Sequence, residues 1–580
     1  MLNFKELVGK HPEFFSVLLL TILCGIFLFW GLDFYPLLDV DETRYAIMSR
    51  DLANSNDWNV LLLNSIPFLE KPPFYFWIVG ASIKLFGSFS EFAVRFPIAL
   101  MASFLVFFTY FFGKKVLSRK FGLFSSIVLL TSVFFLVLSH VAILDMVLTV
   151  WLASSLYSAF LSFVVEEKYK KYCWWGFWTF AGLGFLAKGI LAIAIPAVIL
   201  LIYGSITKTL KEMFKPVNFV VGLIIFLLIS LPWHLIMFRD FGWEFIHEYF
   251  VKHHFARLLT SEELGRKHGF FYFIPIFIVA FMPWTFIFFA SITEGFKKLI
   301  NKYKEAEGSV MKKLYTIVQA DSIEQKLILF SSVFFIVVFG VMSVSSTKLP
   351  TYILPSLPAA ALLTGYFWSV SENRNEHKKA ITISTYIVAM IFIIASLIAS
   401  AAYAFLPQGL IEMVSPFKYS VLIGCAFVGI YLMVKLKSQQ TLSIFSGYVV
   451  TMFFVITFAV TNLFGLIYAG GENELVLYSN YANTTNTRLV TFDFAVKPST
   501  KINYGDFVYF ITDDDFERLY SLISNKSVPT YVIVKNKEVA RKNYQDKLDK
   551  YLYSVQHGKK YSLYLNKEIS DKNKAILWLK

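Results

Sequence analysis

Apolar stretches of about 20 residues follow one another along most of this chain, and they constrain its fold more than any other feature. A helix of that length crosses the hydrocarbon core of a bilayer with its backbone groups hydrogen-bonded internally. Only 16% of the 580 residues are charged, whereas soluble proteins carry roughly 25%. We therefore expect an α-helical polytopic membrane protein with about 13 transmembrane helices. The predicted spans are 13–31, 91–113, 121–139, 144–165, 172–187, 189–206, 217–238, 270–291, 327–345, 353–370, 380–405, 418–434 and 442–468.

Lysine and arginine side chains divide the connecting loops into two sets. One set is strongly basic, as in Lys114-Lys115, Lys170-Lys171 and the long loop 292–326, whereas the alternate loops carry few charges. Loops rich in lysine and arginine stay in the cytoplasm, so this set is predicted to be cytoplasmic. The net charge of +14 is largely this topological signal. Because the basic residues are scattered over many short loops, we expect no nucleic-acid partner.

The same orientation places the loop 32–90 and the C-terminal region on the non-cytoplasmic side. Residues 1–468 form the predicted membrane domain, whereas residues 469–580 are polar. Strand-like and helical patterns alternate in this second region, which predicts a small α/β domain outside the membrane. The predicted strands are 488–494, 507–511, 530–534 and 561–565, and the predicted helices are 514–524 and 539–553.

The external loop 32–90 carries two charged motifs, DETRYA at 41–46 and EKPP at 70–73. Charges beside hydrocarbon are energetically unfavourable, so their presence indicates a site that handles ionic substrates at the bilayer surface. The segments 42–53 and 73–86 mix charged with apolar or aromatic residues. We expect each to form a short helix lying in the membrane interface, where aromatic rings prefer to sit.

Four motifs together resemble a known family. They are DETRYA at 41–46, EKPP at 70–73, LAKG at 186–189 and STKLPTYILPSLP at 346–358, in that order and on the predicted external side. They are similar to motifs of membrane glycosyltransferases with a GT-C fold, specifically the lipid A aminoarabinose transferases, which are related to protein O-mannosyltransferases. The resemblance covers the whole membrane part and implies a GT-C-type fold with a small C-terminal periplasmic α/β domain. It also implies that a sugar moves from a polyprenyl phosphate carrier to an acceptor at the outer face of the inner membrane.

Several cations are candidates for binding that carrier. When a polyprenyl monophosphate leaves the sugar, negative charge builds up on the phosphate, and cations that bind it more strongly in the transition state lower the barrier. The external or near-external cations are Lys71, Lys188, Arg257 and Lys348, and Tyr352 offers a hydroxyl. The structural alternative for each cation is a side chain that extends to the membrane surface and anchors a helix end.

Asp41 is the predicted catalytic residue. If the acceptor is a hydroxyl, Asp41 serves as general base during inversion at the anomeric carbon; if it is an ionised lipid A phosphate, Asp41 positions the acceptor or balances nearby cations. Arg44 lies on the same helical face and can hold Asp41 or a phosphate. The structural alternative is that Asp41 or Glu42 caps the following helix. Glu42, Tyr45 and, by the resemblance, Asp145 complete the predicted substrate-binding set.

The resemblance also implies a structural zinc, or another divalent metal, held by a glutamate and a histidine. The corresponding residues are Glu70 and His254, with Arg257 following. The local sequence KHHFAR at 252–257 departs from the family, which tends to have an acidic residue before the histidine and glutamine before the arginine. Two ligands are also fewer than the four that tetrahedral zinc usually takes. The sequence therefore leaves open whether a metal binds.

The resemblance, together with these residues, implies an inverting glycosyltransferase of the bacterial inner membrane. The predicted donor is undecaprenyl phosphate carrying 4-amino-4-deoxy-L-arabinose or another aminosugar such as galactosamine, and the predicted acceptor is lipid A. An added amine lowers the negative charge of lipid A and weakens its attraction for cationic antimicrobial peptides. One alternative is a protein O-mannosyltransferase of the same fold. The other is a lipid or sugar transporter or flippase, although such proteins usually show internal repeats and ionisable residues at the bilayer midplane, and this sequence shows neither.

Overall fold

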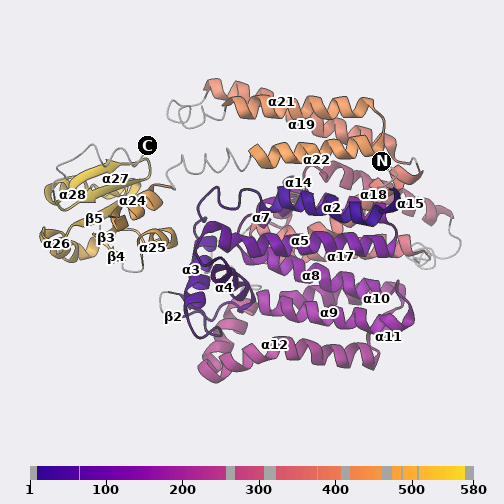
Figure 1. The fold of residues 1–580 in the computed structure, drawn as a ribbon, viewed down its shortest axis with the longest axis horizontal. Coiled ribbons are helices and arrows are strands. Elements are labelled where there is room, and N and C mark those ends of the chain that lie inside the picture. The colour runs from indigo at the N-terminus through magenta and orange to yellow at the C-terminus, as the bar shows by residue number, and fades with distance from the viewer. Residues whose placement is uncertain are drawn as a thin grey trace. The chain divides into compact units, whose positions relative to one another are not determined.

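The computed structural model describes residues 9–63, 66–256, 268–305, 322–374, 376–405, 418–458, 473–484, 487–505 and 508–567, and most of them are helical (Figure 1). The chain forms two compact units. The first comprises Met1–Asp33, Met48–Leu397 and Ile423–Ile456, and the second comprises Phe34–Ile47, Ile398–Leu422 and Thr457–Lys580.

Apolar helices lying side by side make up most of the first unit (Figure 1). Each of the predicted spans overlaps at least one helix. The helices that lie wholly or mostly in this unit are α2 (Pro12–Cys24), η1 (Gly25–Phe29), α4 (Phe74–Phe86), α5 (Glu91–Val116), α6 (Arg119–Leu130), α7 (Val133–Ser139), α8 (Leu144–Leu161), α9 (Glu167–Lys188), α10 (Leu191–Thr207), α11 (Leu210–Met213), α12 (Pro216–Phe245), η2 (Ile246–Ala256), η3 (Phe270–Tyr272), α14 (Phe273–Ala280), α15 (Thr285–Glu305), α17 (Ile323–Val344), η4 (Pro350–Ser356), α18 (Leu357–Arg374), α19 (Lys378–Phe405), α21 (Lys418–Lys437) and α22 (Thr441–Phe458).

The number of spans differs from the sequence prediction. Among the described residues, seven helices are long and apolar enough to cross a membrane, or nine if each of two bent helix pairs is one span. The bends are 63° between α6 and α7 and 115° between the η3–α14 segment and α15. The second break includes Pro283, which has no N–H with which to continue a helix. The fold class, a multi-pass helical membrane protein, is confirmed, whereas the count of 13 is not.

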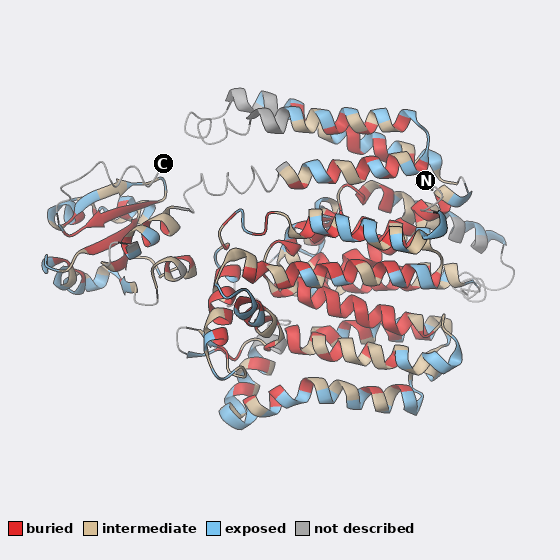
Figure 2. Cartoon of the chain, viewed as in Figure 1, coloured by how far each residue is buried: buried red, intermediate tan, exposed pale blue. Residues whose placement is uncertain are grey.

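Burial divides the helices of the first unit into inner and outer ones (Figure 2). Helix α8 and the η4–α18 segment are almost fully buried, whereas α12 exposes large apolar side chains such as Leu228 and Leu235, as a lipid-facing helix does. Close packing depends on small residues at some contacts. A Cβ on Gly113 of α5 would lie 2.7 Å from the Cα of Gly122 of α6, so this helix pair approaches at a distance that only glycine permits.

Two helices occur where the sequence predicted short interfacial helices. They are α3 (Asp41–Asn54) and α4, and between them lies a small antiparallel pair, β1 (Leu62–Leu63) with β2 (Ile66–Pro67). Helix α4 ends at Gly87, whose φ of 67° is the left-handed conformation that ends many helices. Residues 41–47 of α3 belong to the second compact unit and residues 48–54 to the first.

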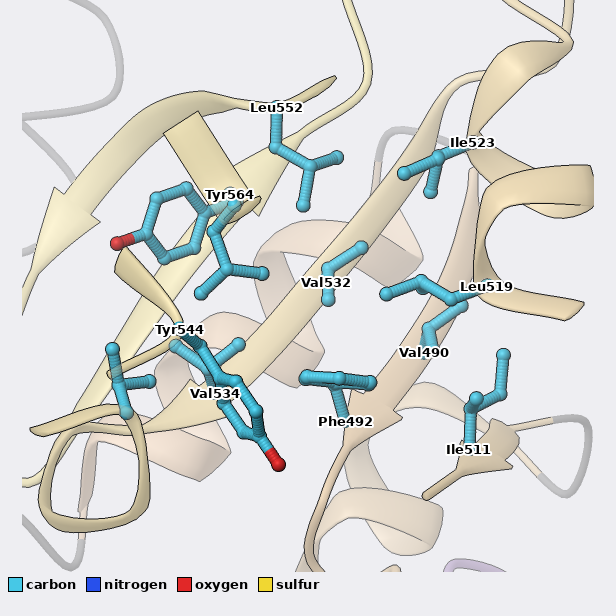
Figure 3. Close-up of a cluster of buried hydrophobic side chains, with 12 residues drawn as sticks. Val490, Phe492, Ile511, Leu519, Ile523, Val532, Val534, Tyr544, Leu552 and Tyr564 are labelled. Atoms are coloured by element: carbon cyan, nitrogen blue, oxygen red, sulfur yellow. The ribbon is translucent and has the colours of Figure 1, made fainter. Parts of the chain in front are cut away.

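The C-terminal region of the second unit is an α/β domain, as predicted. Its five-stranded sheet has the order β4-β3-β5-β7-β6, in which β3 pairs parallel with β4 and β5, and β7 pairs antiparallel with β5 and β6. Figure 3 shows one face of the sheet, where Val490, Phe492, Val532 and Val534 pack against Leu519 and Ile523. The elements are α24 (Asn473–Thr484), β3 (Arg488–Phe492), α25 (Pro498–Tyr504), β4 (Val508–Ile511), η8 (Asp513–Asp515), α26 (Phe516–Ser524), β5 (Thr530–Lys535), α27 (Asn536–Lys542), α28 (Gln545–Tyr551), β6 (Tyr553–His557) and β7 (Tyr561–Leu565).

The sequence prediction of one helix over 539–553 was wrong. The chain forms α27 and α28 there, separated at Asn543, whose φ of 55° ends the first helix. The edge strand β6 then follows and was not predicted. Its pairing with β7 is irregular between Ser554 and Gln556, so its side chains do not follow the strict alternation by which a strand is recognised.

Candidate functional site

Asp145 and Lys188 form an ion pair between neighbouring helices of the first unit. Asp145 lies in the first turn of α8 and Lys188 is the last residue of α9, the positions at which a helix dipole favours a negative and a positive charge. The short connection 162–166 makes the two helices antiparallel, so the start of α8 meets the end of α9. The Lys188 Nζ lies 2.5 Å from the Asp145 Oδ1, and the side chains are only 17% and 13% exposed.

Gly189 gives the LAKG motif a local structural explanation. Its φ of 77° and ψ of −146° lie in a region that residues with a Cβ adopt only with strain. The N–H of Gly189 still donates to the Phe185 carbonyl, so the chain leaves the helix directly after Lys188. The glycine therefore fixes Lys188 at the helix end that faces Asp145.

The STKLPTYILPSLP motif supplies two further side chains. The Lys188 Nζ lies 5.0 Å from the centroid of the Tyr352 ring in η4, within the range of a cation–π contact. Lys348 is buried, and its Nζ donates to the carbonyl oxygens of Ser345 at 2.6 Å and His268 at 3.1 Å. Both acceptors are neutral, so these two contacts hold the ammonium in place without cancelling its charge.

One hydrophobic cluster lies beneath the charged motifs of the first unit. Leu69 directly precedes Glu70, and Leu186 lies two residues before Lys188. The EKPP motif, the LAKG motif and η2 are thereby held around a common apolar group, which positions the half-buried Glu70 and Lys71. The cluster consists of Leu69, Leu186, Trp233, Met237, Phe245 and Tyr249, with Phe74 and Trp77 of α4 packed against it.

Helix α4 is also tied to the chain just before Asp145. The Tyr75 hydroxyl donates to the Ala142 carbonyl at 2.6 Å, and both groups are buried. Tyr75 follows the EKPP motif by two residues, and Ala142 precedes Asp145 by three. Sequence reasoning did not single out Tyr75, because nothing but its place in an aromatic run distinguishes it.

The DETRYA motif forms the first turns of α3, in the second unit. The Arg44 Nη2 lies 2.9 Å from the Asp41 Oδ1, and the Asp41 side chain is 50% exposed. The guanidinium also lies 5.1 Å from the centroid of the Tyr45 ring. Glu42 is buried, and its Oε2 accepts a hydrogen bond from the backbone N–H of Leu38 at 2.7 Å. Glu42 therefore contacts the chain just before the helix start, while Asp41 keeps a solvent-accessible carboxylate.

A contact that the sequence did not predict joins the start of α3 to the C-terminal domain. Asp39 accepts from the Thr43 hydroxyl at 2.7 Å and from the Ser499 hydroxyl at 2.6 Å, and the Ser499 backbone N–H donates to it at 3.2 Å. Ser499 is buried in the first turn of α25. All three residues belong to the second compact unit, although Asp39 and Ser499 are 460 positions apart.

The remaining predicted residues lie partly outside the described residues. His254 falls within η2, but its side chain is not described, and Arg257 lies beyond the end of that segment. Within the described part of the chain, no three His, Cys, Asp or Glu side chains are grouped so that they could hold a metal ion. Glu70 alone does not make such a site, so no chemical step is assigned to a metal.

Comparison with known sequences gives two kinds of match. Residues 70–234 match the profile of a family described as dolichyl-phosphate-mannose-protein mannosyltransferase. Over 347 residues the chain is 28% identical to an undecaprenyl phosphate-alpha-4-amino-4-deoxy-L-arabinose arabinosyl transferase of Wigglesworthia glossinidia brevipalpis, covering 58% of this chain and 56% of the relative. A transferase of the same name from Yersinia enterocolitica is 27% identical over 350 residues, covering 59% and 57%. The chain thus spans little more than half the length of the curated relatives it matches.

Solved structures match nearly the whole chain. The crystal structure of ArnT from Cupriavidus metallidurans bound to undecaprenyl phosphate has a TM-score of 0.74 and 18% identity, covering 96% of this chain and 98% of that one. Its apo state has the same TM-score at 19% identity. The chain therefore has the same fold as the ArnT structure, which is the fold predicted from the four motifs. The matched relatives carry names of the kind of transferase that the four motifs resemble.

Proposed function

We propose that this protein is an inverting membrane glycosyltransferase that moves an aminosugar from undecaprenyl phosphate to lipid A at the periplasmic face of the inner membrane. The observation that carries the proposal is the meeting of two predicted motifs. The lysine of LAKG pairs with Asp145 and contacts Tyr352 of the STKLPTYILPSLP motif, in a chain that has the fold of ArnT. The names of the curated relatives favour 4-amino-4-deoxy-L-arabinose as the sugar over galactosamine.

The cations of the first unit are assigned to the donor. Departure of the polyprenyl phosphate leaves negative charge on its oxygens, and a cation already fixed in place stabilises that charge without reorganising. Lys348 is fixed by two carbonyl groups and Lys188 by Asp145 and the Tyr352 ring. Lys71 extends this set from the EKPP motif, and Arg257 is proposed from the sequence alone.

Asp145 is assigned to hold Lys188 in place for the reaction. With Asp145 ionised, Lys188 can shift between the carboxylate and a substrate phosphate, so its charge is available when the leaving group forms. A lysine without that partner would be an uncompensated charge among apolar helices. Asp145 thus acts through Lys188 as a positioning residue.

Asp41 is assigned to the acceptor. Its carboxylate is half-exposed and accepts from Arg44, so it can reach a substrate while its orientation is fixed. Toward a hydroxyl acceptor it takes the proton as the new glycosidic bond forms and the bond to the carrier phosphate breaks. Toward a phosphate acceptor, which is already ionised, Asp41 and Arg44 orient the reacting oxygen. A metal held by Glu70 and His254 remains a proposal drawn from the resemblance, and no step depends on it.

The test is mass spectrometry of lipid A from cells that lack the gene, carry it, or carry Asp41→Asn. The wild-type gene is expected to add the mass of one aminosugar, and Asp41→Asn to reduce that product at least 100-fold, since a general base contributes about 10²–10⁴-fold. Asp51→Asn is the matched control, because Asp51 is another acid of α3 paired with an arginine, at 2.8 Å. No added sugar with the wild-type gene would refute the function. Full activity of Asp41→Asn would refute the residue assignment alone.

A protein O-mannosyltransferase is the second candidate, supported by the family profile that matches residues 70–234. Both reactions use a polyprenyl phosphate sugar, so the acceptor distinguishes them. If cells that lack the gene lose glycopeptides from the proteome while their lipid A is unchanged, the mannosyltransferase is favoured. A transporter is disfavoured by the placement of the Asp145–Lys188 pair at helix ends instead of at mid-helix.

A further inference from the structure

A basic cavity in the first unit is distinct from the residues assigned to sugar transfer. It has a volume of about 530 Å³ and lies where the start of α19, the end of α21 and the start of α22 meet. Lys378, Lys379 and Lys437 line it, and none of the described residues that line it is acidic. The three lysines belong to loops that the sequence predicted to be cytoplasmic, the opposite membrane face from the DETRYA motif.

The lysines of this cavity differ from the other basic residues near them. Lys435 lies over the ring of Tyr431, and Arg374 pairs with Glu324. By contrast, Lys378, Lys379 and Lys437 are exposed, and among the described residues their ammonium groups have no hydrogen-bond or ion-pair partner. Three like charges around one cavity repel one another, so a bound anion would stabilise the arrangement.

A mostly buried threonine gives the cavity a second polar feature. Thr441 is only 6% exposed and lines the cavity, yet its hydroxyl forms no hydrogen bond within the described part of the chain. Thr441 is the first residue of α22, and Lys378 is the first residue of α19. Two helix N-termini, whose free N–H groups favour anions, therefore border the same cavity.

The apolar surface next to the cavity indicates what kind of anion it takes. Exposed apolar side chains recur along one face of α19 at spacings of three and four residues. They begin beside the cavity and extend over 14 residues, or about 21 Å at 1.5 Å per residue, which exceeds half of a hydrocarbon core of about 30 Å. This stripe consists of Ile383, Ile387, Met390, Ile394 and Leu397.

We propose that this cavity binds the head group of an anionic phospholipid. The phosphate is held by the three lysines and by the Thr441 hydroxyl, and an acyl chain lies along the apolar stripe of α19. A soluble phosphate shares the head-group chemistry but would make no use of the stripe. The proposal does not depend on the sugar-transfer reaction, because none of these residues is assigned to it.

The test is native mass spectrometry of the full-length protein in detergent, titrated separately with phosphatidylglycerol, phosphatidylcholine and inorganic phosphate. The triple variant Lys378→Gln/Lys379→Gln/Lys437→Gln is expected to bind phosphatidylglycerol at least about tenfold more weakly than wild type, and Thr441→Val more weakly by about threefold. The matched control is Lys115→Gln/Lys211→Gln/Lys304→Gln, which removes the same charge from basic helix ends that do not line the cavity. It is expected to change the affinity by less than about twofold.

Three results would overturn the proposal. One is equal loss of affinity in both triple variants, which would mean that only total charge matters. Another is equal binding of phosphatidylcholine, and the third is displacement of phosphatidylglycerol by millimolar phosphate. If the triple variant does not fold, Thr441→Val still tests the proposal, because it removes one oxygen and keeps the shape of the side chain.

Discussion

The charges of Asp145 and Lys188 are stabilised by pairing with a residue far away in the sequence. Asp145 and Lys188 are mostly buried and pair at 2.5 Å. Each alone would be an uncompensated charge between apolar helices, and removing one partner of such a pair typically costs about 3–5 kcal/mol of stability. The pair could therefore serve the fold, the reaction or both, and the two roles differ in what a double substitution restores.

For the Asp145–Lys188 pair we predict that stability and activity separate. Asp145→Asn and Lys188→Met should each lower the Tm in detergent, whereas the double variant should recover most of that loss because no lone charge remains. Transfer of sugar to lipid A should fall at least 100-fold in all three, since the cation or its positioning partner is missing. Recovery of activity together with Tm in the double variant would mean that the pair is only structural.

The same helix offers the control for this cycle. Lys170 and Glu167 pair at 2.5 Å near the start of α9, but the Glu167 side chain is 71% exposed. Exposed pairs of this kind contribute at most about 1 kcal/mol. The variants Glu167→Gln, Lys170→Met and the double should therefore leave both Tm and activity close to wild type.

At the residue scale, single charged residues of the candidate site could be singled out from the sequence, but their contact partners could not. Lys188 and Lys348 were singled out because an isolated cation in an apolar segment is unfavourable unless it has a task. Their partners could not be predicted. The Asp145–Lys188 pair arises from the packing of α8 on α9, and the acceptors of Lys348 are backbone carbonyls, which every residue has. The contact of the Glu42 carboxylate with the Leu38 N–H, ahead of the helix, was not predicted either.

At the scale of elements, the start of α3 is fixed by a residue outside it. Asp39 accepts hydrogen bonds from Thr43 within the first turn and from Ser499 of α25. Asp41 follows two residues later, so a change in this anchor would shift the proposed catalytic carboxylate. Small misplacements of a reacting group can reduce a rate about 100-fold.

We predict that Asp39→Ala lowers kcat for sugar transfer about tenfold while the KM for the donor changes less than about twofold, because Asp39 positions Asp41 without contacting the donor. Ser499→Ala should have a smaller effect in the same direction, and Ser499→Thr, which keeps the hydroxyl, should restore kcat. Steady-state kinetics with purified protein and lipid A measures both constants. Asp33→Ala, which removes another exposed acid before α3, is the control. An unchanged kcat in Asp39→Ala would contradict the positioning role.

The elements themselves were predictable wherever one periodic pattern dominated. The four predicted strands and the two short helices of the external loop are present. The bent pairs α6–α7 and η3–α14 with α15 were not predicted, because hydropathy averaged over a window does not register a change of direction. The strand β6 was missed for the opposite reason, since it lies at the sheet edge with an irregular register.

For the whole molecule, composition settled the class and left the arrangement open. Repeated apolar runs require helices in a bilayer, since only hydrogen-bonded backbone is stable there. The number of spans is harder to predict, because some apolar runs form bent helix pairs or helices too short to cross the membrane. The distribution of basic residues still makes a prediction about sidedness that a labelling experiment can check.

We predict that Ser88 and Lys526 face the periplasm and that Lys115 and Lys211 face the cytoplasm. In a background with Cys24, Cys173 and Cys425 replaced by alanine, cysteines at the first two positions should react with a membrane-impermeant maleimide in cells with a permeabilised outer membrane. Cysteines at the other two should react only after the inner membrane is lysed. Labelling of Ser88→Cys and Lys211→Cys from the same side would contradict the topology, and labelling of Lys526→Cys only after lysis would exclude a periplasmic C-terminal domain.

The Asp39–Ser499 contact also bears on how this protein can diverge or be engineered. Its two residues are 460 positions apart, so a chimaera that receives a foreign C-terminal domain inherits one of them without the other. Grafts among homologues should therefore work best when the loop ahead of α3 is exchanged together with the first turn of α25. Natural variants should show the two positions changing jointly.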